Sequence, residues 1–105
     1  MTQFEKFYCT HKAACRQVAQ LGKTLIESAQ RSYDPKFLDK LQEFKDAEIE
    51  GSARIRAAFD FGIIAMEQAP CFMDEVRDAA RAASVNDEVR TQEDAVRLPE
   101  FGFSS

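Results

Sequence analysis

The sequence is poor in the residues from which catalytic and metal sites are most often built. It contains one histidine, three cysteines and no tryptophan, and no two cysteines stand in a Cys-x-x-Cys spacing. A Ser-His-Asp arrangement would depend entirely on His11, and a di-metal carboxylate bundle would need Glu-x-x-His repeats that the chain lacks. We therefore expect a protein that is not an enzyme and that uses no cofactor.

Long apolar runs and an excess of positive charge are also missing. The longest uncharged apolar block, residues 61–66, is far shorter than the roughly 20 residues that a membrane helix needs. The formal net charge is −4, which argues against direct nucleic-acid binding. The first residues include Glu5 and Lys6 in place of an apolar signal segment, and the cysteine count is odd. We therefore expect a cytoplasmic protein with free thiols.

The charge is unevenly distributed along the chain. Residues 1–33 carry five Lys/Arg against two Asp/Glu, residues 34–69 carry five against eight, and residues 70–105 carry four against eight. A basic first third joined to two acidic thirds favours self-association or docking on a basic partner. We expect a homodimer, with acidic helix faces selecting any further protein partner.

Apolar residues recur with helical spacing over most of the chain. Between residues 4 and 29 they follow alternating steps of four and three, which predicts one long N-terminal helix. Asp34-Pro35 predicts the start of a second helix, with Asp34 as its N-cap. A compatible apolar stripe then runs toward residue 68, so Gly51 either ends this helix at mid-length or lies inside one helix over 35–68.

Pro70 predicts the boundary before a third helix, whose apolar face includes Phe72 and Val76. Residues 84–90 are expected to form a loop or a frayed helix end, and residues 91–94 a capping-box-like start for a short fourth helix that Pro99 stops. No segment alternates with a period of two. The sequence thus predicts an all-α bundle of three to four helices, with one domain over residues 1–98 and a flexible tail over 99–105.

Two groups of residues have spacings that are used in catalytic or metal sites. Asp60-Phe61-Gly62 is the tripeptide that holds metal in protein kinases, but the phosphate loop and lysine that it needs are absent. His11 and Cys15 are one helical turn apart and could join Cys71 in a zinc site or a thiol sensor. The competing interpretation is that these three residues pack in the core.

The run from Phe59 to Met66 is more apolar than one core-facing helix stripe requires. We interpret one face of this run as core and the other as an interface with another chain, with Gly62 permitting close helix packing. Helix 1 is a second candidate for the dimer contact. The predicted partner or dimer interface consists of Phe4, Tyr8, Phe59, Phe61, Gly62, Ile63, Ile64 and Met66.

The stretch Arg56-Ala-Ala-Phe59-Asp-Phe-Gly62-Ile-Ile64 resembles the Ala-Phe-x-x-Gly-Phe/Ile-hydrophobic element of the small helical quorum-sensing antiactivators of the LasR-antiactivator type. The resemblance covers about ten of the 105 residues. It implies a dimeric helical protein that binds a LuxR-type transcription factor and blocks its dimerisation or DNA binding. The expected function is therefore regulation by protein–protein contact. An accessory or chaperone-like subunit and a thiol or zinc sensor are the alternatives.

Overall fold

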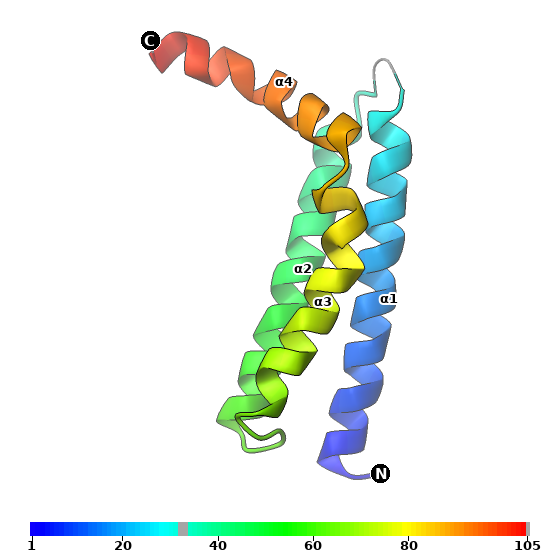
Figure 1. Ribbon diagram of the computed structural model, residues 1–105, viewed down its shortest axis with the longest axis vertical. Coiled ribbons are helices and arrows are strands. Elements are labelled where there is room, and N and C mark those ends of the chain that lie inside the picture. Colours follow the sequence, from blue (N-terminus) through cyan, green and yellow to red (C-terminus); the bar gives the residue numbers. More distant parts are fainter. Residues whose placement is uncertain (32–33, 105) are drawn as a thin grey trace.

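The computed structural model describes residues 1–31 and 34–104, with side chains described through residue 96. These residues form four helices and no strand: α1 (Gln3–Ala29), α2 (Phe37–Asp60), α3 (Gln68–Ser84) and α4 (Asp87–Ser104). The first three helices run alternately up and down as an antiparallel bundle, and α4 points away from one end of it (Figure 1). The predicted small all-α bundle is confirmed.

The first helix begins at a capping interaction and turns one stripe toward the rest of the bundle. Thr2 is the N-cap of α1, and its hydroxyl oxygen accepts a hydrogen bond from the Glu5 backbone N–H at 3.1 Å. The buried residues of α1 from Phe7 to Ser28 recur in steps of three and four. The predicted long N-terminal helix is therefore confirmed.

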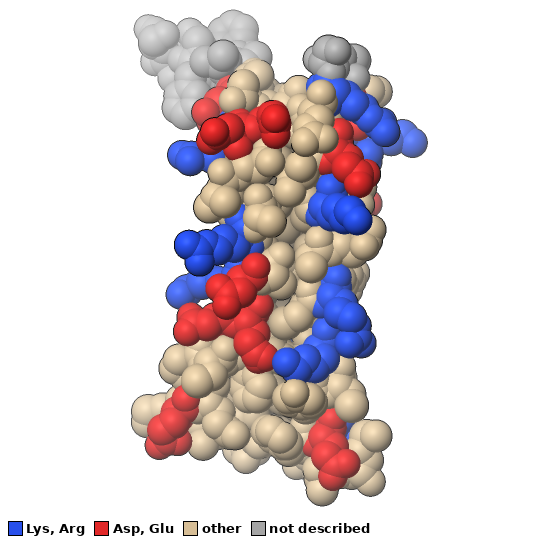
Figure 2. All heavy atoms as spheres, turned by 45° about the vertical axis from the view of Figure 1, so that its right-hand side comes forward, with Lys and Arg blue, Asp and Glu red and all other residues tan. Residues whose placement is uncertain are grey.

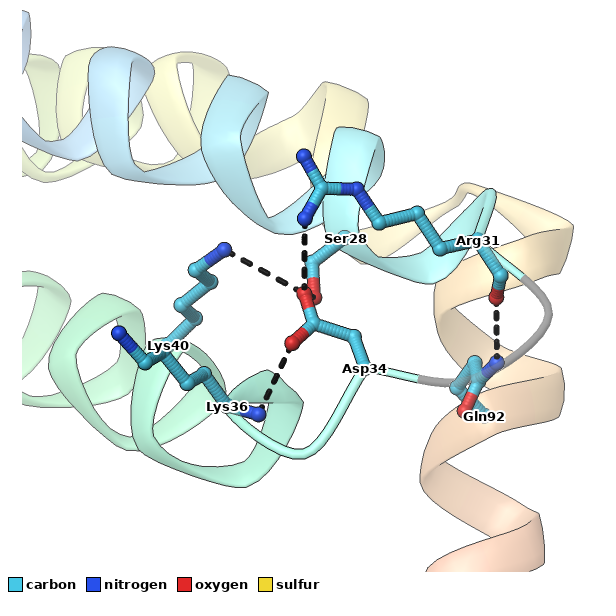
Figure 3. Close-up of polar contacts among 6 residues, drawn as sticks. All are labelled: Ser28, Arg31, Asp34, Lys36, Lys40 and Gln92. Atoms are coloured by element: carbon cyan, nitrogen blue, oxygen red, sulfur yellow. Dashed lines mark hydrogen bonds and ion pairs between the residues drawn. The ribbon is translucent and has the colours of Figure 1, made fainter.

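The carboxylate of Asp34 organises the connection between α1 and α2 (Figure 3). It accepts hydrogen bonds from the Ser28 hydroxyl and from the Lys36 backbone N–H, the latter at 2.9 Å. The side chains of Lys40 and Arg31 place their nitrogens 3.4 and 3.7 Å from the same carboxylate. One half-buried acid thus links the end of α1 to the first turn of α2.

Residues 34–37 form a type I turn that precedes α2. The Phe37 N–H donates to the Asp34 carbonyl at 3.1 Å, and Lys36 has φ −94° and ψ 2°, the values of the third turn residue. Pro35 occupies the second position, where its fixed φ fits. The prediction that Asp34 is the helix N-cap is wrong, because its side chain closes this turn and α2 begins only at Phe37.

The second helix is continuous through Gly51 but shorter than the predicted range of 35–68. Gly51 is buried against Val76 of α3, whose methyl carbons would lie 3.4 and 3.5 Å from an added Cβ. The glycine therefore lets α2 and α3 approach without ending α2. The helix ends instead at Asp60, where the chain turns toward α3.

The start of α4 differs from the prediction of a loop or a frayed helix end over 84–90 and a helix start at Thr91. The Asn86 side-chain oxygen accepts a hydrogen bond from the Val89 N–H at 3.0 Å, and Asp87 and Glu88 occupy the first turn. An asparagine cap followed by two acids complements the free N–H groups of a helix start. These residues begin α4 at Asp87, so that prediction is wrong.

The predicted stop at Pro99 is also wrong, since α4 extends to Ser104. A proline inside a helix removes one backbone donor and can kink the helix, but it does not oblige the helix to end. The side chains of residues 97–105 lie outside the described residues. The expected flexibility of residues 99–105 therefore stays a prediction.

The core is divided into two clusters along the bundle. One, toward α4, includes Leu25, Phe37 and Val89. The other, toward the opposite end, includes Phe7, Ile55, Ile64, Phe72 and Val76. Beyond Val89, α4 is attached by the Lys45–Glu93 ion pair at 3.2 Å and by Gln92, which donates to the Arg31 carbonyl at 3.3 Å.

The two helical glycines that face neighbouring helices are expected to respond oppositely to alanine. Gly51→Ala should raise the free energy of unfolding by about 0.5–1 kcal/mol, because the added methyl makes ordinary contacts and alanine favours the helix. Gly22→Ala should lower it by about 1 kcal/mol, because its methyl would lie 3.2 Å from the Phe44 ring and 3.3 Å from the Ala83 Cβ. Urea unfolding measures both; equal effects would contradict this packing.

Stability should depend on the ionisation of Asp34. Hydrogen bonds from Ser28 and Lys36 lower the pKa of Asp34 from 3.8 to about 2. A carboxyl group whose pKa is lower in the folded state stabilises the fold at any pH above its ordinary pKa. This stabilisation by ionised Asp34 is lost as the pH falls from about 4 toward about 2. The stability difference between the wild type and Asp34→Asn should therefore narrow over this range in urea unfolding. Asp78→Asn, at an exposed position on α3, is the control; an unchanged difference for Asp34→Asn would reject the assignment.

Candidate functional site

The end of α2 is closed by a glycine in the left-handed conformation. Gly62 has φ 74°, and its N–H donates to the Phe59 carbonyl at 3.0 Å. The Ile63 N–H donates to the Ala58 carbonyl at 2.8 Å. These two bonds define a Schellman motif, in which the residue after the glycine folds back against the last turn. Gly62 therefore ends the helix and reverses the chain toward α3.

This geometry corrects the interpretation of residues 59–66 as one helical run. An added Cβ at Gly62 would meet nothing within 4 Å, so the glycine serves backbone conformation and not close helix packing. Ile64 is only 4% exposed and lies in the same core cluster as Ala58 and Phe72. Its predicted role at an interface is wrong in this structure, because the turn that ends α2 directs Ile64 into the protein's own core.

The other predicted interface residues lie at or near the surface of the end of the bundle opposite α4. Phe61 is 82% exposed and Met66 is 69% exposed, while Phe59 is less exposed and Ile63 is half-buried. On α1, the rings of Phe4 and Tyr8 are partly exposed and stack with centroids 6.2 Å apart. Figure 2 shows that this end carries few charged side chains on the face in view, whereas both signs are interspersed above it. We call this end of the bundle, with Phe4, Tyr8, Phe59, Phe61, Ile63 and Met66 at or near its surface, the apolar end.

A groove of about 320 Å³ lies between α1 and the end of α2. Its apolar lining comes from Phe7 and Ala58 and from Phe61 and Ile63 in the turn after α2. Its charged lining is entirely basic, consisting of Lys6 and Arg54. The sequence prediction missed these two residues, because only the pairing of α1 with α2 brings them to one groove.

The opposite flank of the apolar end carries an ion pair between α1 and α3. Lys12 Nζ lies 3.1 Å from Glu75 Oε1 and 5.1 Å from the centre of the Tyr8 ring. The hydrogen bond that Lys12 donates to the Glu75 carboxylate raises the pKa of Lys12, because it favours the charged ammonium. The pair lies close to the Phe4–Tyr8 stack and fixes α1 against α3 there.

His11 is a core residue. It is 2% exposed, and its ring packs against both Phe7 and Phe72 with centroid distances of 5.8 and 4.8 Å. Its Nε2 atom lies 3.5 Å from Glu75 Oε2 and 3.6 Å from Cys15 Sγ. The interpretation of His11 as a core residue is therefore confirmed. Glu75 and Cys15 are the polar partners of its buried Nε2 atom.

The structure does not assemble the predicted zinc ligands. Among the described residues, no group of three or more His, Cys, Asp or Glu side chains is placed to hold a metal ion. Cys71 is exposed near the start of α3, and Cys9 is exposed on α1. Burial raises the pKa of the Cys15 thiol, with Glu75 adding to the effect, so the reactive thiolate is disfavoured at neutral pH. His11, Cys15 and Cys71 therefore do not come together in one metal site.

None of the helices in the described part of the chain is both long and apolar enough to cross a membrane. A comparison with protein-family models, curated proteins and solved structures found no significant match to this chain.

Two neighbouring apolar residues should respond very differently to truncation. Ile64→Ala should lower the free energy of unfolding by about 2–5 kcal/mol, because it leaves a cavity in the core. Phe61→Ala should change it by no more than about 0.5 kcal/mol, because the ring is exposed. Urea unfolding of both variants tests this division; a large loss for Phe61→Ala would show that Phe61 belongs to the core.

Proposed function

We propose that the protein is a non-enzymatic regulator that binds another protein through the apolar end. The observation that carries this proposal is an aromatic side chain, Phe61, that is 82% exposed beside an apolar groove. Exposed apolar surface of this kind is unfavourable in water unless a partner covers it. Phe4, Tyr8 and Met66 extend the apolar surface beyond the groove.

The charges around the groove support a particular kind of partner. Lys6 and Arg54 are the charged residues that line it, and they would attract acidic groups that flank apolar anchors on the partner. The acidic faces of the chain, including Asp39 and Glu43, are exposed on α2 outside this groove. The proposed partner segment is therefore acidic at this site, in contrast to the basic partner expected from the overall charge.

An antiactivator is the sharpest form of this proposal. The resemblance over residues 56–64 implies a LuxR-type transcription factor as the partner, and these residues form the end of α2 and the turn that presents Phe61. In this form, an apolar helix of the transcription factor would occupy the groove between α1 and α2. Its surface would then be withheld from dimerisation or DNA binding.

Phe61→Asp tests the general proposal by placing a carboxylate on the exposed anchor. We expect this variant to lose proteins that the wild type captures from native cytoplasm, with its helical circular-dichroism spectrum unchanged. Leu38→Asp is the matched control, since Leu38 is also exposed but lies at the other end of α2. Equal capture by the wild type and Phe61→Asp would reject the apolar end as the binding site.

A DNA-binding assay tests the antiactivator form separately. The wild type, added to a purified LuxR-type factor bound to its DNA, should release the DNA in a mobility-shift experiment, and Phe61→Asp should not. If the wild type releases no DNA while the capture experiment still depends on Phe61, the partner belongs to another class.

A further inference from the structure

A second hollow lies between α1 and α2, farther from the apolar end than the groove beside Phe61. It has a volume of about 240 Å³, and Leu21 of α1 and Ala47 of α2 are part of its lining. The charged residues of its described lining are all acidic, namely Glu43, Asp46 and Glu50. Since the groove beside Phe61 has a basic lining, the same two helices present two hollows of opposite charge.

The two hollows follow one line along the packed helices. On α1 the lining residues Gln3, Thr10 and Gln17 are separated by two helical turns each, so they lie on one face. On α2 the lining positions of both hollows recur in steps of three and four. Arg54 of the first hollow forms an ion pair at 3.8 Å with Glu50 of the second, which joins them. We call this line, with both hollows, the α1–α2 seam.

The two ends of the seam carry charges that a partner can reach. Lys6 at one end and Glu43 and Asp46 at the other are exposed. Within the described part of the chain these three residues form no ion pair, although Asp46 accepts a hydrogen bond from Gln42 at 2.8 Å. Arg54 and Asp46 are about 12 Å apart along the axis of α2, from their separation in the sequence. The seam is therefore basic beside Phe61 and acidic about two turns farther along.

We propose that the α1–α2 seam binds an amphipathic helix of the partner protein that is acidic at one end and basic at the other. The inference rests on the proposed function and specifies the partner segment. The acidic end of this helix lies beside Lys6 and Arg54, and its basic end lies beside Glu43 and Asp46. Its apolar face lies along the seam between them, so the charges also set the direction in which the helix is bound.

A helix with this charge pattern fits the seam because of its shape and its charge. Two packed helices leave a straight groove between them, in which a third helix can bury one apolar face. Ala57 of the first hollow and Ala47 of the second are small, so they permit a close approach of the partner backbone. A uniformly acidic helix would be repelled at one end of the seam, and a uniformly basic helix would be repelled at the other.

Three synthetic peptides test this charge pattern by fluorescence anisotropy. Each has about 18 residues, enough for a helix of about 27 Å, and all share the same leucine face. The bipolar peptide has glutamates on its first two turns and lysines on its last two, whereas the others are uniformly acidic or uniformly basic. We expect the wild type to bind the bipolar peptide at least about fivefold more tightly than either uniform peptide, because opposite charges then meet at both ends.

Reversing the acidic end of the seam should reverse the preference. Glu43→Lys/Asp46→Lys makes both ends basic, so this variant should bind the uniformly acidic peptide more tightly than the bipolar one, with an unchanged helical circular-dichroism spectrum. Asp74→Lys/Asp78→Lys is the matched control, because it changes the net charge equally at exposed positions of α3. The control should keep the preference of the wild type.

Equal binding of the three peptides by the wild type, or binding of none, would overturn the inference. A bipolar preference that persists in Glu43→Lys/Asp46→Lys would also overturn it. The capture experiment with Phe61→Asp decides the proposed function separately. If capture depends on Phe61 while the peptides show no charge preference, the proposed function stands and the bipolar helix is rejected; if capture does not depend on Phe61, both are rejected.

Discussion

The left-handed conformation of Gly62 is the constraint on which the candidate site depends. It ends α2 at Asp60 through two hydrogen bonds, and this ending lets the chain return as α3 beside α1. The same turn separates neighbouring apolar residues, because Ile64 enters the core while Phe61 stays in solvent. Without this backbone reversal, the groove between α1 and α2 would lose the part of its lining that follows the helix.

Periodic spacing predicted most of the helical bundle, and the errors occur where local hydrogen bonds in turns and caps set the ends of the helices. The steps of four and three identified α1 because its buried stripe spans many turns. The apolar spacing in the sequence continues past Asp60, although α2 ends there. The reason is that a Schellman motif returns the apolar residue Ile63 to the last turn of the helix. The sequence also predicts Asp34 as the N-cap of α2, whereas its carboxylate accepts a hydrogen bond from the Lys36 N–H and closes a turn before the helix.

The sequence predicted the exposed aromatic residues of the candidate site but not its charged residues. The exposure of Phe61 could be predicted from the sequence, because the run from Phe59 to Met66 contains more apolar residues than one core-facing helix stripe requires. Lys6 and Arg54 could not, because they are far apart in the chain and become neighbours of one groove only through the packing of α1 on α2. The overall negative charge consequently indicated the opposite sign of partner from the one that the groove would attract.

The division of the core into two clusters has a consequence for how the sequence can vary. The cluster around Phe7 and Phe72 supports the apolar end, while the one around Leu25 and Phe37 holds the α1–α2 connection and the start of α4. Substitutions in separate clusters that share no partners usually have additive effects on folding free energy. The residues of the apolar end can therefore be changed with little effect on the packing at the opposite end, so that one scaffold can present different surfaces.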